Sequence, residues 1–134
     1  MIISIDPGHR TGICVLYTYD NEKHIDLFTV NGADIKVLRY CTNLNRITII
    51  VERMPKVMSM KMSTIMQDLD TQLREMFKQS LDTVERIAPS EWKPMCRARK
   101  WKCEAKIHER DAYNMVRYYM FTSSLNIDLG DYVG

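Results

Sequence analysis

Two acidic residues in this chain each follow directly after an apolar run. Asp6 comes after Ile2–Ile5, and Glu52 comes after the β-branched run Ile47–Val51. A carboxylate beside a buried strand is unfavourable unless a cation or a hydrogen-bond donor compensates its charge. Because ligands of open α/β sheets bind at the carboxyl ends of parallel strands, we expect both side chains at one sheet edge. Each acid could instead be structural, Asp6 as the cap of the turn at Gly8 and Glu52 as an ion-pair partner of Arg53 or another base.

His108 and Asp111 are three residues apart, a spacing that places two side chains on one face of a helix. Met115 and Tyr118 share this face, so we expect it to point toward the core, whereas Glu109 falls off it and is expected in solvent. A histidine alone is more often a buried structural residue, but its spacing from Asp111 favours a ligand. With the two strand-end acids, these side chains make four mostly oxygen-donor ligands of the kind that Mg²⁺ or Mn²⁺ prefers.

A site of this composition suits the hydrolysis of a phosphodiester by two divalent ions. One ion activates a water molecule for in-line attack and the other stabilises the leaving oxygen, while carboxylates hold both ions. Phosphoryl transfer needs little else from the protein than positioning and charge stabilisation. The residues predicted to be both metal ligands and catalytic residues, with two Mg²⁺ or Mn²⁺ ions per site, are Asp6, Glu52, His108 and Asp111.

The positive charge is concentrated in one segment, although the net charge of the chain is only +2. Residues 93–107 contain six basic residues and one acid, a local charge of +5. Next to a metal site, such a cluster is expected to contact DNA phosphates, and Trp92 or Trp101 could stack on an unpaired base. A solvated helix face is the alternative interpretation. The predicted DNA-binding residues are Lys93, Arg97, Arg99, Lys100, Trp101, Lys102 and Lys106.

The composition is that of an ordinary globular protein. With 134 residues, 46% of them apolar and 27% charged, the chain is expected to form one domain with a complete core. No apolar run approaches the roughly 20 residues of a membrane helix, and the first residues lack the charged front of a signal peptide, so we expect an intracellular protein. The four cysteines are expected to be reduced thiols, because Cys96, Cys103 and His108 have spacings that match no common zinc module.

Hydrophobic periodicity predicts five strands and four helices. Alternating and β-branched segments predict strands over residues 2–6, 12–19, 24–30, 47–51 and 84–88. Apolar steps of three and four predict helices over 34–43, 57–80 and 101–121, and a further helix starts near Pro89 with Ser90 as its cap. This order predicts an α/β fold: a mixed five-stranded sheet, with three antiparallel N-terminal strands and two parallel strands, flanked by helices. We expect a domain over 1–122 and a tail over 123–134.

Four segments, in the same order, resemble the motifs of the RuvC-like Holliday junction resolvases of the RNase H-like superfamily, especially the short phage and viral members. Residues 2–12 resemble the opening IDPG-x-x-x-G motif, and residues 49–52 resemble the strand that ends in the second acid. Residues 88–93 are similar to the P-x-x-W/V-K segment, and residues 108–112 are similar to the D/H-x-x-D-A helix motif. The resemblance spans about residues 1–120.

The resemblance implies an RNase H-like nuclease domain with the activity of a crossover junction endodeoxyribonuclease. Such an enzyme nicks two strands of a four-way DNA junction symmetrically and leaves 5′-phosphates and 3′-hydroxyls, in DNA recombination and repair. It also implies a homodimer through the helix Met58–Phe77, although packing on the sheet is the alternative role of that methionine-rich face. No nucleotide cofactor is implied, and the expected location is a bacterial cytoplasm or a cell infected by a phage or virus.

Two departures from the family pattern keep other functions open. Arg53-Met54-Pro55 stands where an aromatic wedge is expected after the second acid, and the connection before the last helix is shortened to Met95–Lys102. A broader debranching nuclease and a non-catalytic junction-binding protein therefore remain alternatives. An ATPase of the sugar-kinase or actin-like class also opens with an acid and glycines after its first strand, but it needs two related domains and a far longer chain.

Overall fold

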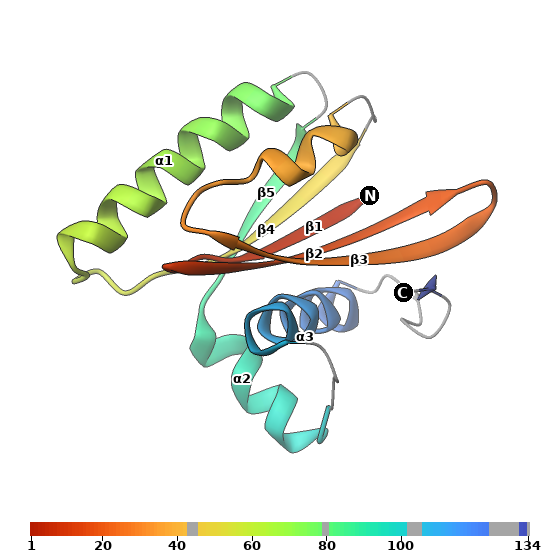
Figure 1. Cartoon of the computed structure of the whole chain (residues 1–134). Helices are drawn as coiled ribbons and strands as arrows, with labels where there is room; N and C mark the ends of the chain where they lie inside the picture. The colour runs from red at the N-terminus through yellow and green to blue at the C-terminus, as the bar shows by residue number, and fades with distance from the viewer. Residues whose placement is uncertain (43–45, 79–80, 102–105, 124–131, 134) are drawn as a thin grey trace.

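The structure, a computed structural model, describes residues 1–42, 46–78, 81–101, 106–123 and 132–133. A mixed β-sheet forms the middle of three layers (Figure 1). One face of the sheet is covered by two helices and the other face by two more. On the first face lie α1 (Met60–Phe77) and the 3₁₀ helix η1 (Lys36–Cys41), and on the second lie α2 (Pro89–Ala98) and α3 (Ile107–Thr122).

The sheet confirms the predicted fold class. Its order is β5-β4-β1-β2-β3-β6, in which β1 is antiparallel to β2, β2 is antiparallel to β3, and β4 is parallel to both β1 and β5. The strands are β1 (Ile2–Asp6), β2 (Arg10–Tyr19), β3 (Glu22–Asn31), β4 (Ile47–Glu52), β5 (Leu81–Ile87) and β6 (Tyr132–Val133). The five predicted strands are therefore present, with β1 in the interior of the sheet.

The tail expected at 123–134 contributes a short strand to this sheet. Within it, β6 pairs in parallel with β3, where Lys23 is opposite Tyr132. Residues 124–131 and 134 lie outside the described residues. Part of the tail therefore lies against the edge strand of the domain.

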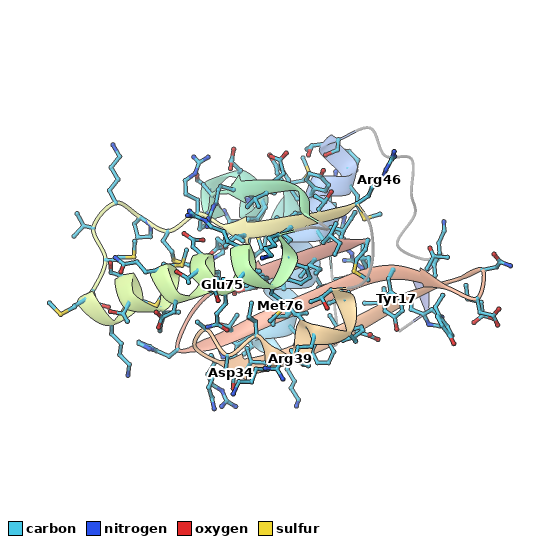
Figure 2. The ribbon with its side chains drawn as sticks, turned by 90° about the horizontal axis from the view of Figure 1, so that it is seen from above. Tyr17, Asp34, Arg39, Arg46, Glu75 and Met76 are labelled. Atoms are coloured by element: carbon cyan, nitrogen blue, oxygen red, sulfur yellow. The ribbon has the colours of Figure 1, made fainter. Side chains whose placement is uncertain are left out.

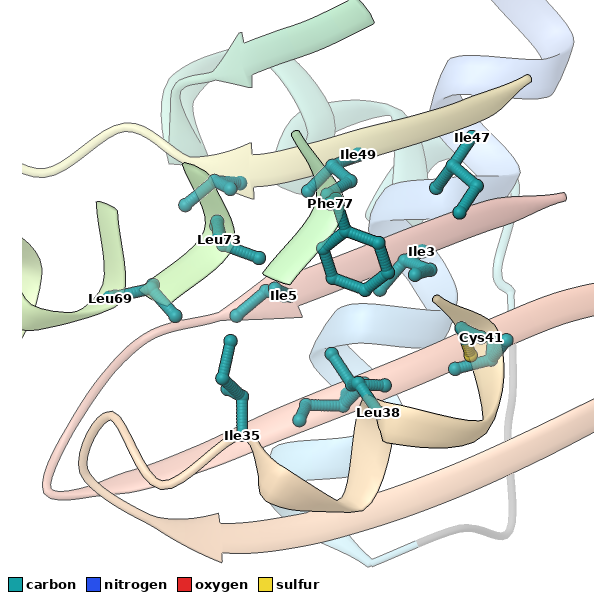
Figure 3. Packing of buried hydrophobic residues seen from close by; sticks show 13 residues of the cluster. Ile3, Ile5, Ile35, Leu38, Cys41, Ile47, Ile49, Leu69, Leu73 and Phe77 are labelled. Atoms are coloured by element: carbon teal, nitrogen blue, oxygen red, sulfur yellow. The ribbon is translucent and has the colours of Figure 1, made fainter. Parts of the chain in front are cut away.

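The helix α1 covers one face of the sheet through a single apolar stripe. Ser59 caps its N-terminus, because the Ser59 hydroxyl accepts a hydrogen bond of 3.1 Å from the Met62 backbone N–H. Leu69, Leu73 and Phe77 then pack on β1 and β4 (Figure 3). The helix is shorter than the predicted 57–80 at both ends, because its N-terminal cap lies at position 59 and its last residue is Phe77.

The predicted crossover helix over 34–43 is a 3₁₀ helix rather than an α-helix. In η1 the buried residues Leu38 and Cys41 are three positions apart, and three residues per turn places them on the same face. That face closes the core beside α1. Figure 2 shows the two elements next to each other from above, with Glu75 and Met76 on α1 and Arg39 on η1.

Two predicted helix starts are corrected by the structure. In α2 the cap is not Ser90: Pro89 begins the helix, and the Glu91 carboxylate accepts a hydrogen bond of 2.6 Å from the Ala88 backbone N–H. The last helix does not begin at Trp101, because Lys100 has a left-handed φ of 52° that ends α2, and α3 begins only at Ile107. No helix in the described part of the chain is long and apolar enough to cross a membrane.

Candidate functional site

The two strand-end acids lie side by side at one edge of the sheet, as predicted. The parallel register of β1 and β4 pairs Ile5 with Val51, so Asp6 and Glu52 follow at neighbouring positions. Glu52 is only 7% exposed, and Asp6 is half-buried. Two carboxylates are thus held together where the surrounding core removes most of their water.

Asp6 does not cap the turn that follows it, and the base whose charge acts on Glu52 is Lys93 rather than Arg53. The turn after Asp6 is closed by Thr11, whose hydroxyl accepts a hydrogen bond of 3.2 Å from the Gly8 backbone N–H. Arg53 is exposed and its guanidinium lies near the Arg86 carbonyl oxygen, at 3.5 Å, rather than on Glu52. A turn cap and an ion pair with Arg53 therefore do not account for these two buried carboxylates.

Asp111 of α3 completes a cluster of three acids. Burial, followed by the negative charges of Glu52 and Asp111, raises the pKa of Asp6 from an ordinary value of 3.8 to about 8. A hydrogen bond between the Asp6 and Glu52 carboxyls acts in the same direction, whereas the positive charge of Lys93 opposes it. At neutral pH the two strand-end acids therefore hold a proton between them.

Glu52 has a partner that the sequence did not reveal. The Trp92 indole Nε1–H donates a hydrogen bond of 2.8 Å to Glu52 Oε2 in a buried environment. Burial raises the pKa of Glu52, and this hydrogen bond and the charge of Lys93 oppose the rise. Trp92 is only 2% exposed, so of the two tryptophans predicted to be available for stacking on an unpaired base, only Trp101 is accessible.

The position of α3 explains how its residues reach the site. Gly12 pairs with Asp6 across β1 and β2, and a Cβ at Gly12 would overlap the backbone carbonyl of His108. The first turn of α3 therefore rests directly on β2, next to Asp6. His108 and Asp111 are both half-buried there, and the interactions that link the three acids do not extend to the His108 side chain.

The inward face of α3 is only partly as predicted. Met115 is fully buried, which confirms that this part of the helix faces the core. Glu109 was expected in solvent but is only 9% exposed, because the first turn of α3 lies flat against the sheet at Gly12. The carboxylate of Glu109 does not take part in the interactions of Asp6 and Glu52.

The donor set suits a hard divalent cation, although the side chains are not arranged as a closed ligand set. Among the described residues, no three His, Cys, Asp or Glu side chains are placed to hold a metal ion. Asp6 and Glu52 instead share a proton, and the negative charge of Asp111 and the positive charge of Lys93 act on both of them. Carboxylate oxygens with this excess of negative charge fit Mg²⁺ or Mn²⁺, which would replace the proton. Cys96 is a free thiol, and Cys103 lies outside the described residues.

Comparison with known proteins finds similarity in the fold but not in the sequence. The sequence matches no protein-family model and no curated protein sequence. The structure resembles Thermus thermophilus RuvC in complex with a Holliday junction substrate, with a TM-score of 0.64 and 12% identity over 93% of this chain and 95% of that chain. The chain has the fold of the RuvC resolvases. A second structure of Thermus thermophilus RuvC gives a TM-score of 0.57, also at 12% identity, over 92% of this chain and 95% of that chain.

In this RuvC-like fold, most of the predicted basic segment lies on α2 or directly after it. Lys93 is exposed, with its ammonium nitrogen 5.5 Å from the centre of the Trp92 ring, and its charge acts on both Asp6 and Glu52. The exposed basic residues on or directly after α2 are Lys93, Arg97, Arg99 and Lys100, and Lys106 is exposed just before α3. Lys102 lies outside the described residues. Among the described cations of this segment, Lys93 is the one whose charge acts on the acid cluster.

Two of the basic-segment residues also contact α3. The Arg99 guanidinium lies 3.9 Å from the centre of the Phe121 ring, a cation–π geometry that joins the end of α2 to α3. Trp101 is half-buried, with the Arg117 guanidinium 5.9 Å from its ring centre. These two residues therefore have packing roles besides any contact with DNA.

Proposed function

We propose that this chain is a metal-dependent endonuclease that resolves Holliday junctions. The observation that carries the proposal is the cluster of Asp6, Glu52 and Asp111 at the carboxyl edge of the sheet, on the RuvC fold. The solved RuvC structure in complex with a Holliday junction substrate supports branched DNA as the substrate. The products are 5′-phosphates and 3′-hydroxyls.

The proposed chemistry depends on four metal ligands and a row of basic residues. Asp6, Glu52 and Asp111, with His108 beside them, would hold two Mg²⁺ or Mn²⁺ ions, which supply an activated water and stabilise the leaving oxygen. Burial of the acids excludes bulk water and strengthens their hold on a cation. Lys93 would bind a phosphate next to the cluster, and the remaining basic residues of α2 would contact the rest of the strand.

Symmetric cleavage requires two copies of the site, and we propose a homodimer. Val57 and Met60, at the start of α1, are 89% and 87% exposed, and Met58 beside them is also exposed. Exposed apolar side chains gathered in one place are typical of an interface. A second copy that covers this end of α1 would place the two acid clusters in one particle.

A broader debranching nuclease is the second candidate, because of the residues after Glu52. Arg53 and Pro55 are exposed and Met54 is half-buried, so this position carries no aromatic side chain that could open a junction. Recognition of the crossover would then depend on charge and shape alone. Such an enzyme would cut several kinds of branch.

The experiment compares labelled four-way, flap and Y-shaped DNA in Mg²⁺ and in Mn²⁺. The resolvase proposal predicts paired, symmetric nicks in the four-way junction and much slower cutting of the other two. Equal rates on all three substrates would favour the debranching nuclease. Asp6→Asn is the control, because it should abolish cutting while junction binding in Ca²⁺ is kept; if it changes no DNA-processing effect, the chain is a non-catalytic binding protein.

A further inference from the structure

The hydrogen bond between Trp92 and Glu52 joins two elements that are 40 residues apart in the sequence. Trp92 lies in the first turns of α2, and Glu52 is the last residue of β4. The N···O distance is 2.8 Å, and both side chains are buried. Such a bond is short and charge-assisted, and a buried bond of this kind fixes the orientation of the carboxylate.

Among the described residues, Trp92 is the one side chain outside the acid cluster that donates a hydrogen bond to Asp6, Glu52 or Asp111. Its ring also packs in the core on this face of the sheet, with Ile87 and Met115. Apolar packing alone would be satisfied by a phenylalanine. The indole nitrogen adds a directed hydrogen bond to Oε2 of Glu52. The other carboxylate oxygen, Oε1, does not accept this bond.

We propose that Trp92 is a positioning residue that orients Glu52 for a divalent cation. A Glu52 carboxylate that could rotate would lose more conformational freedom on binding a cation than one already held by Trp92. With Oε2 held by the indole, the Glu52 carboxylate has a fixed orientation in which a cation would meet it. This inference rests on the proposed metal-dependent function, and it adds a residue that touches neither the metal nor DNA.

The first experiment measures Mn²⁺ affinity in the absence of DNA. Trp92→Phe keeps an aromatic ring in the core and removes the N–H donor. We expect its affinity for Mn²⁺, followed by the electron paramagnetic resonance signal of free Mn²⁺, to fall roughly 10- to 100-fold, the usual loss when a partner of a metal ligand is removed. Cleavage of the four-way junction should need correspondingly more Mn²⁺ and should recover at high Mn²⁺ concentration.

Val116→Ala is the matched control for lost packing. Val116 is fully buried in the same core cluster as Trp92 but donates no side-chain hydrogen bond. The control should lose thermal stability and keep its Mn²⁺ affinity. If Trp92→Phe binds Mn²⁺ as tightly as the wild-type chain, or if Val116→Ala weakens Mn²⁺ binding equally, Trp92 has only a packing role and the proposal is overturned.

A second measurement uses the unaltered side chain and does not depend on whether Trp92→Phe folds. The chain has two tryptophans, so a ¹H–¹⁵N spectrum contains two indole N–H signals, and the spectrum of Trp101→Phe identifies that of Trp92. On addition of Mg²⁺, the Trp92 signal should shift with the same midpoint as the Mg²⁺ dependence of cleavage. Glu52→Gln should move the signal without Mg²⁺ and abolish the Mg²⁺-dependent shift. A Trp92 signal that does not respond to Mg²⁺ in a chain that cuts DNA would contradict the proposal.

Loss of the nuclease activity and loss of the Trp92 role have different experimental signatures. If the wild-type chain binds neither Mn²⁺ nor Mg²⁺ and cuts no DNA, the proposed function fails, and the role of Trp92 fails with it. If the wild-type chain binds Mn²⁺ and cuts junctions while Trp92→Phe does both at the same Mn²⁺ concentration, the nuclease stands and only the role of Trp92 is removed.

Discussion

Gly12 of β2 and His108 of α3 are in backbone contact, and no side chain fits between them. A Cβ at Gly12 would overlap the carbonyl oxygen of His108 and lie 3.0 Å from the Glu109 backbone nitrogen. Because Gly12 also pairs with Asp6, this contact fixes the distance between the strand that carries one acid and the helix that carries another. The geometry of the candidate site therefore depends on a residue with no side chain.

Gly12→Ala is predicted to damage both stability and activity. The added methyl group meets backbone rather than a flexible side chain, so α3 must move away from β2 and take Asp111 with it. Overpacking of this kind costs about 1–3 kcal/mol, which urea denaturation would measure. Junction cleavage should fall much further than the remaining folded fraction explains.

The matched control for this prediction is Gly32→Ala. Gly32 has a left-handed φ of 51°, and the nearest atom to an added Cβ is Ile65 Cγ1 at 3.8 Å. This change should lower stability through backbone strain of roughly 1–2 kcal/mol while leaving the acid cluster in place. If the two variants lose cleavage in proportion to their stability, the contact of Gly12 with α3 has no special role in the site.

The stability of the metal-free protein is predicted to fall between about pH 4 and pH 8. Burial, with the charges of Glu52 and Asp111, raises the pKa of Asp6 from 3.8 to about 8, so over this range the folded chain keeps a proton that the unfolded chain releases. The contribution of the Asp6 proton to the free energy of unfolding is complete at low pH, decreases as the pH rises, and is lost above the pKa of Asp6 in the folded chain. Urea denaturation in EDTA at a series of pH values measures this.

Asp6→Asn tests the assignment of that pH dependence. Asparagine does not ionise, so the variant should lose less stability than the wild-type chain over the same range and should be the more stable protein at pH 8. Added Mg²⁺ at pH 8 should stabilise the wild-type chain and have little effect on the variant. Parallel stability curves for the two proteins would show that the proton is not held at Asp6.

The basic segment is predicted to set the salt dependence of DNA binding. Replacing Arg97, Arg99 and Lys100 by alanine removes three exposed charges, and each lost phosphate contact lowers the slope of log K against log salt by about 0.9. Junction binding in Ca²⁺ at several salt concentrations gives this slope. A control that removes Lys36, Arg39 and Lys78, which are exposed on the opposite side of the sheet, should leave the slope unchanged. Equal slopes in both triple variants would show that the segment is a solvated surface.

The exposed start of α1 is predicted to hold two copies together. Met60→Glu places a charge in the proposed interface and should weaken the dimer at least about tenfold, as measured by analytical ultracentrifugation. Thr18→Glu adds the same charge to an exposed position of β2 and should have no effect on the dimer. A wild-type chain that sediments as a monomer at high concentration would remove the dimer from the proposal.

The sequence was sufficient for the parts of the site that follow from local patterns. Asp6 and Glu52 each end a continuous apolar run, and such runs predict buried neighbouring strands with their ends at one edge. The spacing of His108 and Asp111 indicated a shared helix, and α3 contains both, although it begins six residues later than predicted. These inferences needed only strand and helix periods.

The residues that were missed or misplaced depend on contacts between distant segments. The burial of Glu109 follows from the contact of α3 with Gly12, about 100 residues earlier in the chain. Trp92 lies next to a basic residue in the sequence and was expected at the surface, whereas its partner Glu52 is on another element. The cap of α2 was misassigned because Glu91 reaches back to Ala88, and the neighbouring Ser90 is an equally good capping residue by type.

The three acids of the site are distributed over nearly the whole chain, from the first strand to the last helix. Asp111 is synthesised roughly a hundred residues after Asp6, and it reaches the cluster only when α3 has packed on β2. A nascent or truncated chain that lacks α3 therefore has two acids sharing a proton, without the third carboxylate. The proposed cutting activity thus begins only after folding is complete, so incomplete copies of the chain would not cut DNA.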